Sequence, residues 1–332
     1  MNTQKLFLFI AIFLTVFLLW DKWELTQSVD ENGNVITQTQ LVSNDSSTET
    51  NDVPLPSDVP SAELQVSEDS TPSINEPINS GGYTTVVTDL LTLQISHKGG
   101  TIISALLNKY PETLNSEERF ELLSNSPDRI FHAQSGLIPA DQMPTHQDQY
   151  TSEREEYFLG GESELTVPLK WTDNNGVTVT KNFHFKPDSY VIDVDYQIDN
   201  NSSSDRVVSS YTQLAHGASQ KSGGFMMGMQ NFNGGAIYND EEIFEKIDFE
   251  DFDSSPKTTS IGGWAAMIQH YFFSAWIPNE KDKHTYSTKS SRDNFLLTTV
   301  NPSSRITAGS SVNIGKNQLF IGPKEHVRLE NL

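Results

Sequence analysis

Histidines are the side chains of this chain best suited to acid–base and metal chemistry, and their spacing does not assemble them into a site. No two of them lie four residues apart, so no pair would share one face of a helix as zinc ligands do. The eight positions are His97, His132, His146, His184, His216, His270, His284 and His326. A zinc site built from residues distant in the sequence stays open as an alternative.

The sequence also lacks the motifs of nucleophilic and nucleotide-dependent enzymes. It contains no G-x-S-x-G elbow, P-loop or dinucleotide-binding fingerprint, and no cysteine. Thiol catalysis, disulfides and thiolate metal sites are therefore excluded. The 44 acidic residues are too numerous to single out a glycosidase pair. We predict that the chain is not an enzyme, and we expect no catalytic residue, metal or cofactor.

Residues 262–278 form an aromatic stretch that begins with two glycines. This stretch is the first candidate for contacts with a partner. Its candidate residues are Gly262, Gly263, Trp264, Tyr271, Phe272 and Trp276. Interpreted as one strand, it places Gln269, Tyr271, Phe273 and Ala275 on one face, and His270, Phe272, Ser274 and Trp276 on the other. Bulky groups on both faces are typical of a central, covered strand, so a pure core role is the alternative.

Residues 240–253 form a second candidate contact, with eight acidic residues and one lysine between apolar side chains. Phe244, Phe249 and Phe252 could dock a basic or amphipathic partner. The segment lacks the glycine and the 12-residue spacing of a calcium loop. The alternative is an acidic surface segment held in place by its aromatic residues.

An apolar run at residues 6–20, LFLFIAIFLTVFLLW, predicts a transmembrane anchor. Fifteen helical residues rise about 22 Å, so we extend the helix to residue 25 to approach the roughly 30 Å hydrocarbon core. The membrane-facing candidates are Leu6, Phe9, Phe13, Phe17, Trp20 and Trp23. A cleaved signal peptide is the alternative, but no small-residue cleavage site follows the run.

Charge predicts the orientation of this anchor. Lys5 precedes the run, and no Lys or Arg occurs between Lys22 and Lys98. Because short cytoplasmic segments carry the cations, we expect a cytoplasmic amino terminus and an exported body. The formal net charge of −22 argues against nucleic acid as a partner and against docking on anionic lipid. Membrane lipid is expected to be contacted through the anchor alone.

The rest of the chain predicts a linker and one β-rich domain. Residues 26–82 contain no aromatic residue and no cation, and we interpret them as a disordered acidic linker. From residue 83 to 322, apolar and polar residues alternate in short runs, for example at 165–171, 177–185 and 190–198. The turn residues 172–176 separate the first two runs and predict a hairpin there. This period of two predicts a large, mainly antiparallel β-sandwich.

Few helices are expected. Residues 114–123 are interpreted as a short helix, 240–249 are ambiguous, and 323–332 are interpreted as the start of a helix after the Gly322–Pro323 break.

Several segments together resemble the exported domain of Gram-negative members of the YidC/Oxa/Alb family. The resemblance rests on 262–278, and in chain order on Leu19 to Trp23, Gly99 to Leu107 with Tyr110 and Pro111, Phe120 to Ser124, Ala133 to Leu137, and Leu319 to Pro323. It implies a β-supersandwich of the galactose mutarotase-like type in the periplasm. It also implies that the family's membrane core, with five further transmembrane helices, would begin after Leu332.

The resemblance implies a membrane protein insertase and chaperone in the bacterial inner membrane, working alone or with the Sec translocon. Its implied partners are nascent membrane proteins, the Sec translocon and the accessory SecDF complex. The alternatives are an anchored periplasmic carbohydrate-binding or mutarotase-like protein, supported by analogy of fold only, and a structural spacer.

Overall fold

The computed structural model describes residues 78, 81–113, 116–139, 143–217, 233–239, 244–255, 257–269, 271–291 and 294–324. The predicted anchor (1–25), nearly all of the predicted linker (26–82) and the end of the predicted terminal helix (325–332) lie outside these residues. Within the described ranges, no helix has the length and apolar character needed to cross a membrane.

The described strands form two sheets. The eleven-stranded sheet has the order β14-β17-β18-β11-β5-β4-β3-β2-β1-β7, with β19 beside β11. Its strands are β1 (Tyr83–Val87), β2 (Leu91–Ser96), β3 (Thr101–Pro111), β4 (Arg119–Ser126), β5 (Arg129–Ile138), β7 (Glu156–Phe158), β11 (Arg206–Gly217), β14 (Thr258–Ile261), β17 (Lys283–Ser291), β18 (Asn294–Val300) and β19 (Ser304–Ile306).

The nine-stranded sheet has the order β13-β12-β15-β16-β20-β10-β9-β8-β6 among the described residues. Its strands are β6 (Thr151–Ser152), β8 (Leu165–Thr172), β9 (Val177–Phe185), β10 (Val191–Asn200), β12 (Asn233–Tyr238), β13 (Glu245–Asp248), β15 (Trp264–Gln269), β16 (Phe272–Ile277) and β20 (Ser310–Pro323). A single turn of 3-10 helix, η1 (Phe249–Asp251), follows β13. Among the described residues, all strand pairings are antiparallel except that of β1 with β7.

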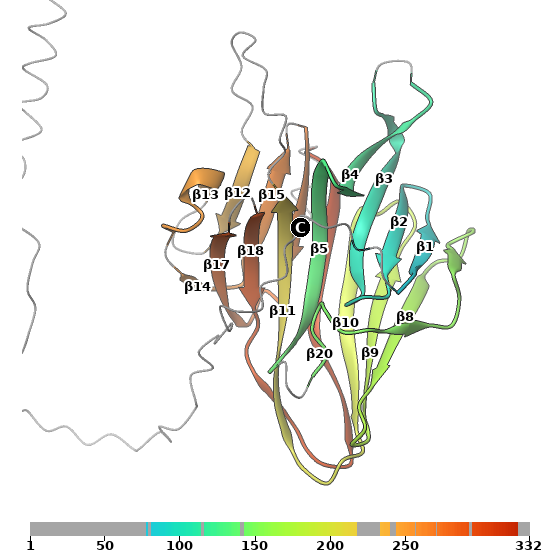
Figure 1. The fold of residues 1–332 in the computed structure, drawn as a ribbon, viewed down its shortest axis with the longest axis vertical. Coiled ribbons are helices and arrows are strands. Elements are labelled where there is room, and N and C mark those ends of the chain that lie inside the picture. The colour runs from blue at the N-terminus through green and yellow to red at the C-terminus, as the bar shows by residue number, and fades with distance from the viewer. Residues whose placement is uncertain are drawn as a thin grey trace, which may run out of the picture. The chain divides into compact units, whose positions relative to one another are not determined.

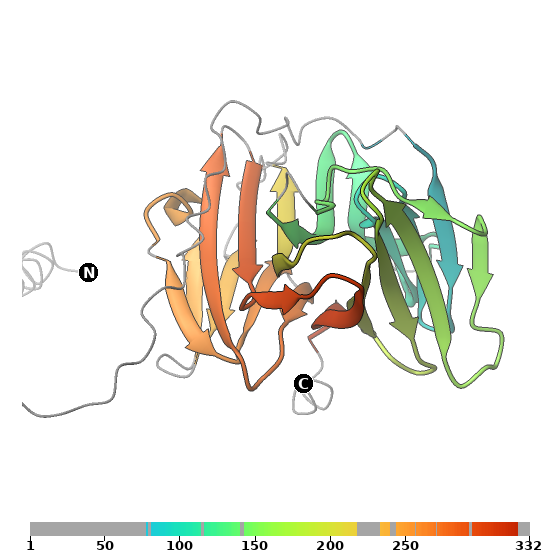
Figure 2. The same ribbon diagram turned by 90° about the horizontal axis from the view of Figure 1, so that it is seen from below.

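The two sheets pack face to face around a shared core (Figures 1 and 2). Phe131 and Leu214 from the eleven-stranded sheet lie in one apolar cluster with Phe183, Val194 and Trp276 from the nine-stranded sheet. Each fully buried side chain of this size contributes about 1.5–3 kcal/mol to folding. The prediction of a mainly antiparallel β-sandwich is confirmed.

The predicted hairpin of β8 and β9 is also confirmed. Leu165 pairs with Phe185 and Trp171 with Val179. In the turn, Asp173 Oδ1 accepts hydrogen bonds from two backbone N–H groups, and Gly176 adopts φ +93°. Strict alternation and a glycine turn therefore predicted this hairpin correctly.

Two predictions of local structure were wrong. Residues 119–123 belong to strand β4 instead of the short helix predicted at 114–123. Phe120 stacks on Phe272 of the opposite sheet at 4.3 Å, so tertiary packing overrides local helix propensity. The ambiguous segment 240–249 contributes strand β13 and the first residue of η1 among its described residues.

The second error concerns residues 262–278, which form the β15–β16 hairpin instead of one strand. Gln269 pairs with Phe272 and so lies on the same face as Phe272, not on the opposite face as predicted. The turn after Gln269 reverses the chain, and the alternation therefore restarts at β16. The central position of both strands within the sheet agrees with the prediction.

Candidate interaction surface

The two aromatic motifs singled out from the sequence meet on one face of the nine-stranded sheet. Tyr238 on β12 is directly opposite Trp264 on β15, and their rings stack at 5.7 Å with an interplanar angle of 13°. Phe244, just before β13, contacts the same Trp264 ring at 5.8 Å. We call Tyr238, Phe244 and Trp264 the outer aromatic cluster.

The outer aromatic cluster faces away from the opposing sheet. Trp276 Nε1 donates a hydrogen bond of 3.2 Å to the carbonyl of Gln213 in the eleven-stranded sheet, so Trp276 points inward. Ala265 pairs with Trp276 and shares its inward face. Because side chains alternate along a strand, Trp264 points outward.

Two members of this cluster are open to solvent. Phe244 is 44% exposed and Tyr238 is 37% exposed. Lys246 Nζ lies 5.7 Å from the centre of the Phe244 ring, a cation–π distance. Large aromatic side chains are enriched at protein interfaces, so this cluster can act as an anchor for a partner.

The glycine pair explains how Trp264 is positioned. Gly262 and Gly263 have φ values of +64° and +90°. Residues with a Cβ atom rarely adopt this backbone conformation. A Cβ atom on Gly263 would lie 2.2 Å from the carbonyl oxygen of Tyr238. Tyr286 Oη donates a 2.6 Å hydrogen bond to the Gly262 carbonyl. The pair therefore forms a tight turn that brings Trp264 beside Tyr238.

The other predicted contact residues divide between core and surface. Phe272 packs inward on Phe120 at 4.3 Å and on Tyr110 at 5.2 Å, and Trp276 is 2% exposed. Tyr271, in the β15–β16 turn, is 70% exposed. Within the predicted partner motif, the structure thus places Trp276 in the core and Tyr271 at the surface, whereas Trp264 and Phe272 are both half-buried and pack against the core from opposite faces of the hairpin.

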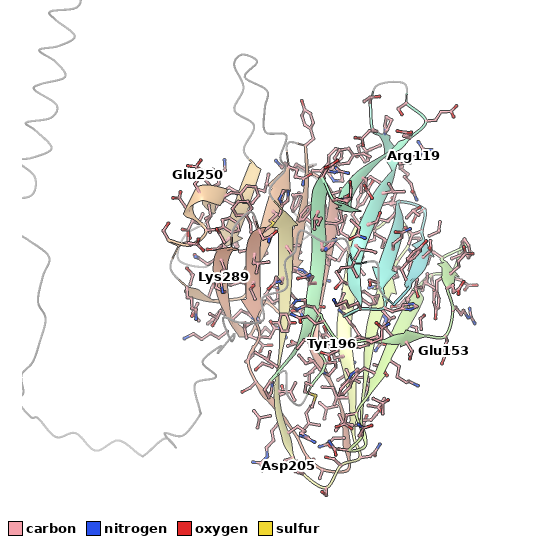
Figure 3. The ribbon with its side chains drawn as sticks, in the orientation of Figure 1. Arg119, Glu153, Tyr196, Asp205, Glu250 and Lys289 are labelled. Carbon is pink, nitrogen blue, oxygen red and sulfur yellow. The ribbon has the colours of Figure 1, made fainter. Side chains whose placement is uncertain are left out.

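The predicted docking segment divides in the same way. Phe252 is fully buried, and Phe249 stacks on Phe295 at 4.3 Å. Phe244 alone of its three aromatic candidates is exposed, while Glu250 of η1 lies at the edge of the domain (Figure 3). The six membrane-anchor candidates lie outside the described residues.

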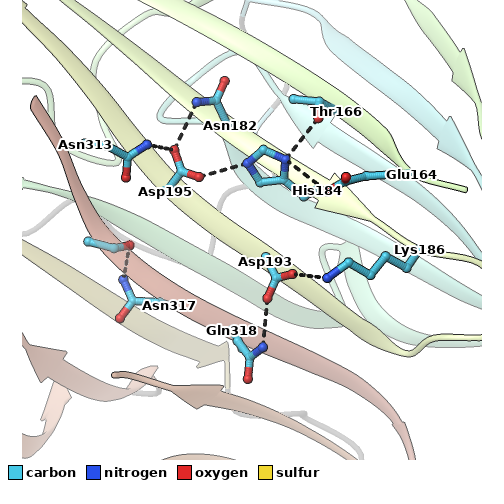
Figure 4. Close-up of polar contacts among 11 residues, drawn as sticks. Glu164, Thr166, Asn182, His184, Lys186, Asp193, Asp195, Asn313, Asn317 and Gln318 are labelled. Carbon is cyan, nitrogen blue, oxygen red and sulfur yellow. Dashed lines mark hydrogen bonds and ion pairs between the residues drawn. The ribbon is translucent and has the colours of Figure 1, made fainter. Parts of the chain in front are cut away.

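A polar network that the sequence analysis missed covers another part of the same outer face (Figure 4). His184 Nε2 contacts Asp195 Oδ2 at 2.8 Å, and its Nδ1 lies 3.0 Å from Thr166 Oγ1. Asp195 Oδ1 also accepts hydrogen bonds from Asn182 at 3.0 Å and from Asn313 at 2.8 Å. We call these residues the His184 network.

The His184 network resembles part of a catalytic site. A histidine oriented by a carboxylate could act as a base, yet the ring nitrogen that would accept the proton, Nδ1, already lies 3.0 Å from the Thr166 hydroxyl. Among the described residues, no group of three or more His, Asp or Glu side chains is placed to hold a metal ion. Polar residues at the outward positions 182 and 184 of β9 and 195 of β10 were the available sequence signal. Recognising them as one network required knowing that β9 pairs with β10.

A buried lysine on the inner face was also missed. Lys181 is 0% exposed, and its Nζ donates hydrogen bonds to the carbonyls of Gly99 and Gly100, each at 2.9 Å, and of Ser135 at 3.1 Å. Burial lowers the pKa of Lys181 to about 7. These bonds join β9 to the opposing sheet, and so we assign Lys181 a structural role between the sheets.

Comparisons with known proteins agree with the β-rich domain described above. Residues 83–332 match the YidC periplasmic domain family. Proteins named "Membrane protein insertase YidC" from Ruthia magnifica and Vesicomyosocius okutanii are 48% and 46% identical to this chain over 334 and 336 residues. Each alignment covers 100% of this chain and 60% of the relative. The chain thus spans about three fifths of the length of these curated relatives.

Solved structures with similar folds are far more distant in sequence. A galactose mutarotase-like protein from Lactobacillus casei has a TM-score of 0.47 and 9% identity, covering 73% of this chain and 99% of that one. The Slr1438 protein from Synechocystis has a TM-score of 0.44 and 9% identity, covering 73% and 96%.

Proposed function

Because the chain belongs to the YidC periplasmic domain family, we propose that it is the anchored, periplasmic part of a membrane protein insertase. The whole protein would assist the insertion and folding of bacterial inner-membrane proteins, alone or with the Sec translocon. The observation that supports this function is the match of the full chain to relatives named as membrane protein insertases.

The physical task of such a protein requires no covalent step. An apolar segment gains about 25 cal/mol for each Å² of apolar surface that it transfers from water into lipid. The chain would therefore act as a chaperone that lowers the barrier to this transfer, and not as an enzyme. Nascent membrane proteins would be its substrates.

We assign separate roles to the parts of the chain. Residues 1–25 would anchor it with the amino terminus in the cytoplasm, residues 26–82 would act as a tether, and residues 83–322 would lie in the periplasm. Residues 323–332 would lead towards the membrane core. The outer aromatic cluster would dock accessory Sec subunits such as the SecDF complex, since two of its rings are exposed.

Depletion of the protein that contains this chain tests the proposed function. Inner-membrane vesicles would be prepared with and without it, and insertion of a single-span membrane protein would be measured by protease protection. We expect insertion to fall in depleted vesicles and to recover when the purified protein is added back. Unchanged insertion in depleted vesicles would overturn the proposal.

A further inference from the structure

Strand β20 connects two distinct ends of the domain. Ser310 pairs with Asn200 at one end, and Pro323 pairs with Phe272 at the other. The first end consists of polar turns that contain no aromatic residue, at 173–176, 201–205 and 307–309. Figure 3 shows Asp205 at its tip. We call the other end, where β20 ends, the Pro323 end.

Aromatic residues from both sheets meet at the Pro323 end. Phe272 on β16 packs edge-on against Tyr110 of β3 at 5.2 Å and stacks on Phe120 of β4 at 4.3 Å. All three rings are half-buried. Tyr271, the preceding residue, is 70% exposed and is the most exposed large apolar or aromatic side chain in the described part of the chain. The Pro323 end is therefore aromatic where the opposite end is polar.

The backbone holds Tyr271 beside the last residues of β20. Lys324 N donates a hydrogen bond of 2.9 Å to the carbonyl of Tyr271, and the side chain of Lys324 is exposed as well. Tyrosine and lysine each combine an apolar body with a polar tip, which suits the boundary between lipid headgroups and acyl chains. Tyrosine is enriched at that boundary in membrane proteins.

The β3–β4 hairpin and the residue after β20 carry exposed charges of both signs. They are Lys109, Glu112, Glu117, Glu118, Arg119 and Lys324. Because three acidic side chains offset three basic ones, these charges do not form the basic cluster that anionic lipid attracts. A membrane contact at this end would therefore depend on its aromatic side chains.

We propose that the Pro323 end rests on the periplasmic surface of the bilayer, with the Tyr271 ring between the lipid headgroups and the acyl chains. This placement rests on the proposed function, in which residues 323–332 lead towards the membrane core. Residues 325–332 span at most about 28 Å when fully extended, so the Pro323 end lies close to the bilayer. The domain thus contacts lipid itself, whereas the net charge led us to expect a contact through the anchor alone.

Quenching of a fluorescent label by lipid tests this contact. Because the chain contains no cysteine, Lys109→Cys at the Pro323 end or Val207→Cys near the opposite end would carry a single NBD label. Both positions are exposed. The full chain would be reconstituted in phosphatidylcholine vesicles that contain lipid with a doxyl quencher near the headgroup. We expect quenching of the label at 109 and none at 207, with or without added phosphatidylglycerol.

A substitution at Tyr271 tests whether its ring makes the contact. Tyr271→Ser should reduce quenching at position 109 by about half or more, because this ring supplies much of the exposed apolar surface at the Pro323 end. Phe158→Ser is the matched control, since it removes a 60% exposed ring from β7, and it should leave quenching unchanged. Equal losses in the two variants, or no loss with Tyr271→Ser, would overturn the proposal.

Three further outcomes would also contradict a contact with lipid. They are equal quenching at 109 and 207, quenching at 109 only when phosphatidylglycerol is present, and protection of the label at 109 from aqueous iodide without quenching by lipid. The last result would indicate a protein partner or a second copy. Since the measurement needs no translocon or substrate, it is independent of the insertion assay. An unquenched label with normal insertion would overturn this contact and leave the proposed function standing.

Discussion

The two faces of the β15–β16 hairpin carry similar aromatic side chains in different surroundings. Trp276 on the inner face is 2% exposed and hydrogen-bonds to the opposing sheet. Trp264 on the outer face stacks on Tyr238 and makes a tilted contact with Phe244, and both of these partners are exposed. Residues 262–278 therefore place one tryptophan in the core and the other in a candidate docking surface. Residue type alone does not distinguish these two positions.

The largest expected effect on stability comes from a substitution on the inner face. Trp276→Ala should lower the free energy of unfolding by about 3–5 kcal/mol, because it removes a large buried side chain and leaves a cavity. Denaturant unfolding of the full chain in detergent measures it. A loss no larger than that of Trp264→Ala would contradict the assignment of inner and outer faces.

Lys181→Met tests the polar part of the inner face. The three carbonyls that accept hydrogen bonds from Lys181 would lose their donor. Each unpaired buried acceptor costs about 1–3 kcal/mol, offset in part because an ammonium no longer has to be buried. We expect net destabilisation in the same unfolding assay. A variant as stable as the parent would show that the lysine does not join the sheets.

Lys181 should contribute to the pH dependence of the free energy of unfolding. Its folded-state pKa of about 7 lies below the usual 10.5, so between these values the unfolded chain binds more protons than the folded chain. Stability should therefore rise with pH above about 7, by at most about 1.4 kcal/mol per pH unit. Lys181→Met should remove this rise, and identical slopes in both proteins would contradict the pKa shift.

The smallest effect on stability is expected on the outer face. Trp264→Ala should cost about 1 kcal/mol, the scale of an aromatic pair at a partly exposed site. The same substitution should nevertheless reduce recovery of Sec accessory subunits with the full-length protein from membranes. Phe272→Ala is the matched inner-face control, since it should reduce recovery only to the extent that it reduces the amount of folded protein. Undiminished recovery with Trp264→Ala would count against docking at this cluster.

Local sequence patterns predicted the positions of strands better than they predicted which strands pair with each other. The β8–β9 hairpin was predictable because alternation flanks a turn of Asp, Asn and Gly residues. The β15–β16 hairpin was not, because Gln269, His270 and Tyr271 carry none of the usual turn signals.

The candidate sites depend even more on contacts distant in sequence. Trp264 meets Phe244 through the pairing of β12 with both β13 and β15, which no local pattern specifies. Lys181 occupies an inward position between Val179 and Phe183, where alternation predicts an apolar residue. Its three carbonyl partners come from the opposing sheet and so could not be anticipated.

Photo-crosslinking in native membranes tests the docking role of the outer aromatic cluster most directly. A photoreactive residue would replace Phe244 in the cluster or, as a control, the exposed Lys170 on β8 of the same sheet. We predict adducts with nascent inner-membrane proteins or Sec accessory subunits from position 244 and none from position 170. Equal labelling from both positions, or no adduct from position 244 in a folded protein, would contradict the account.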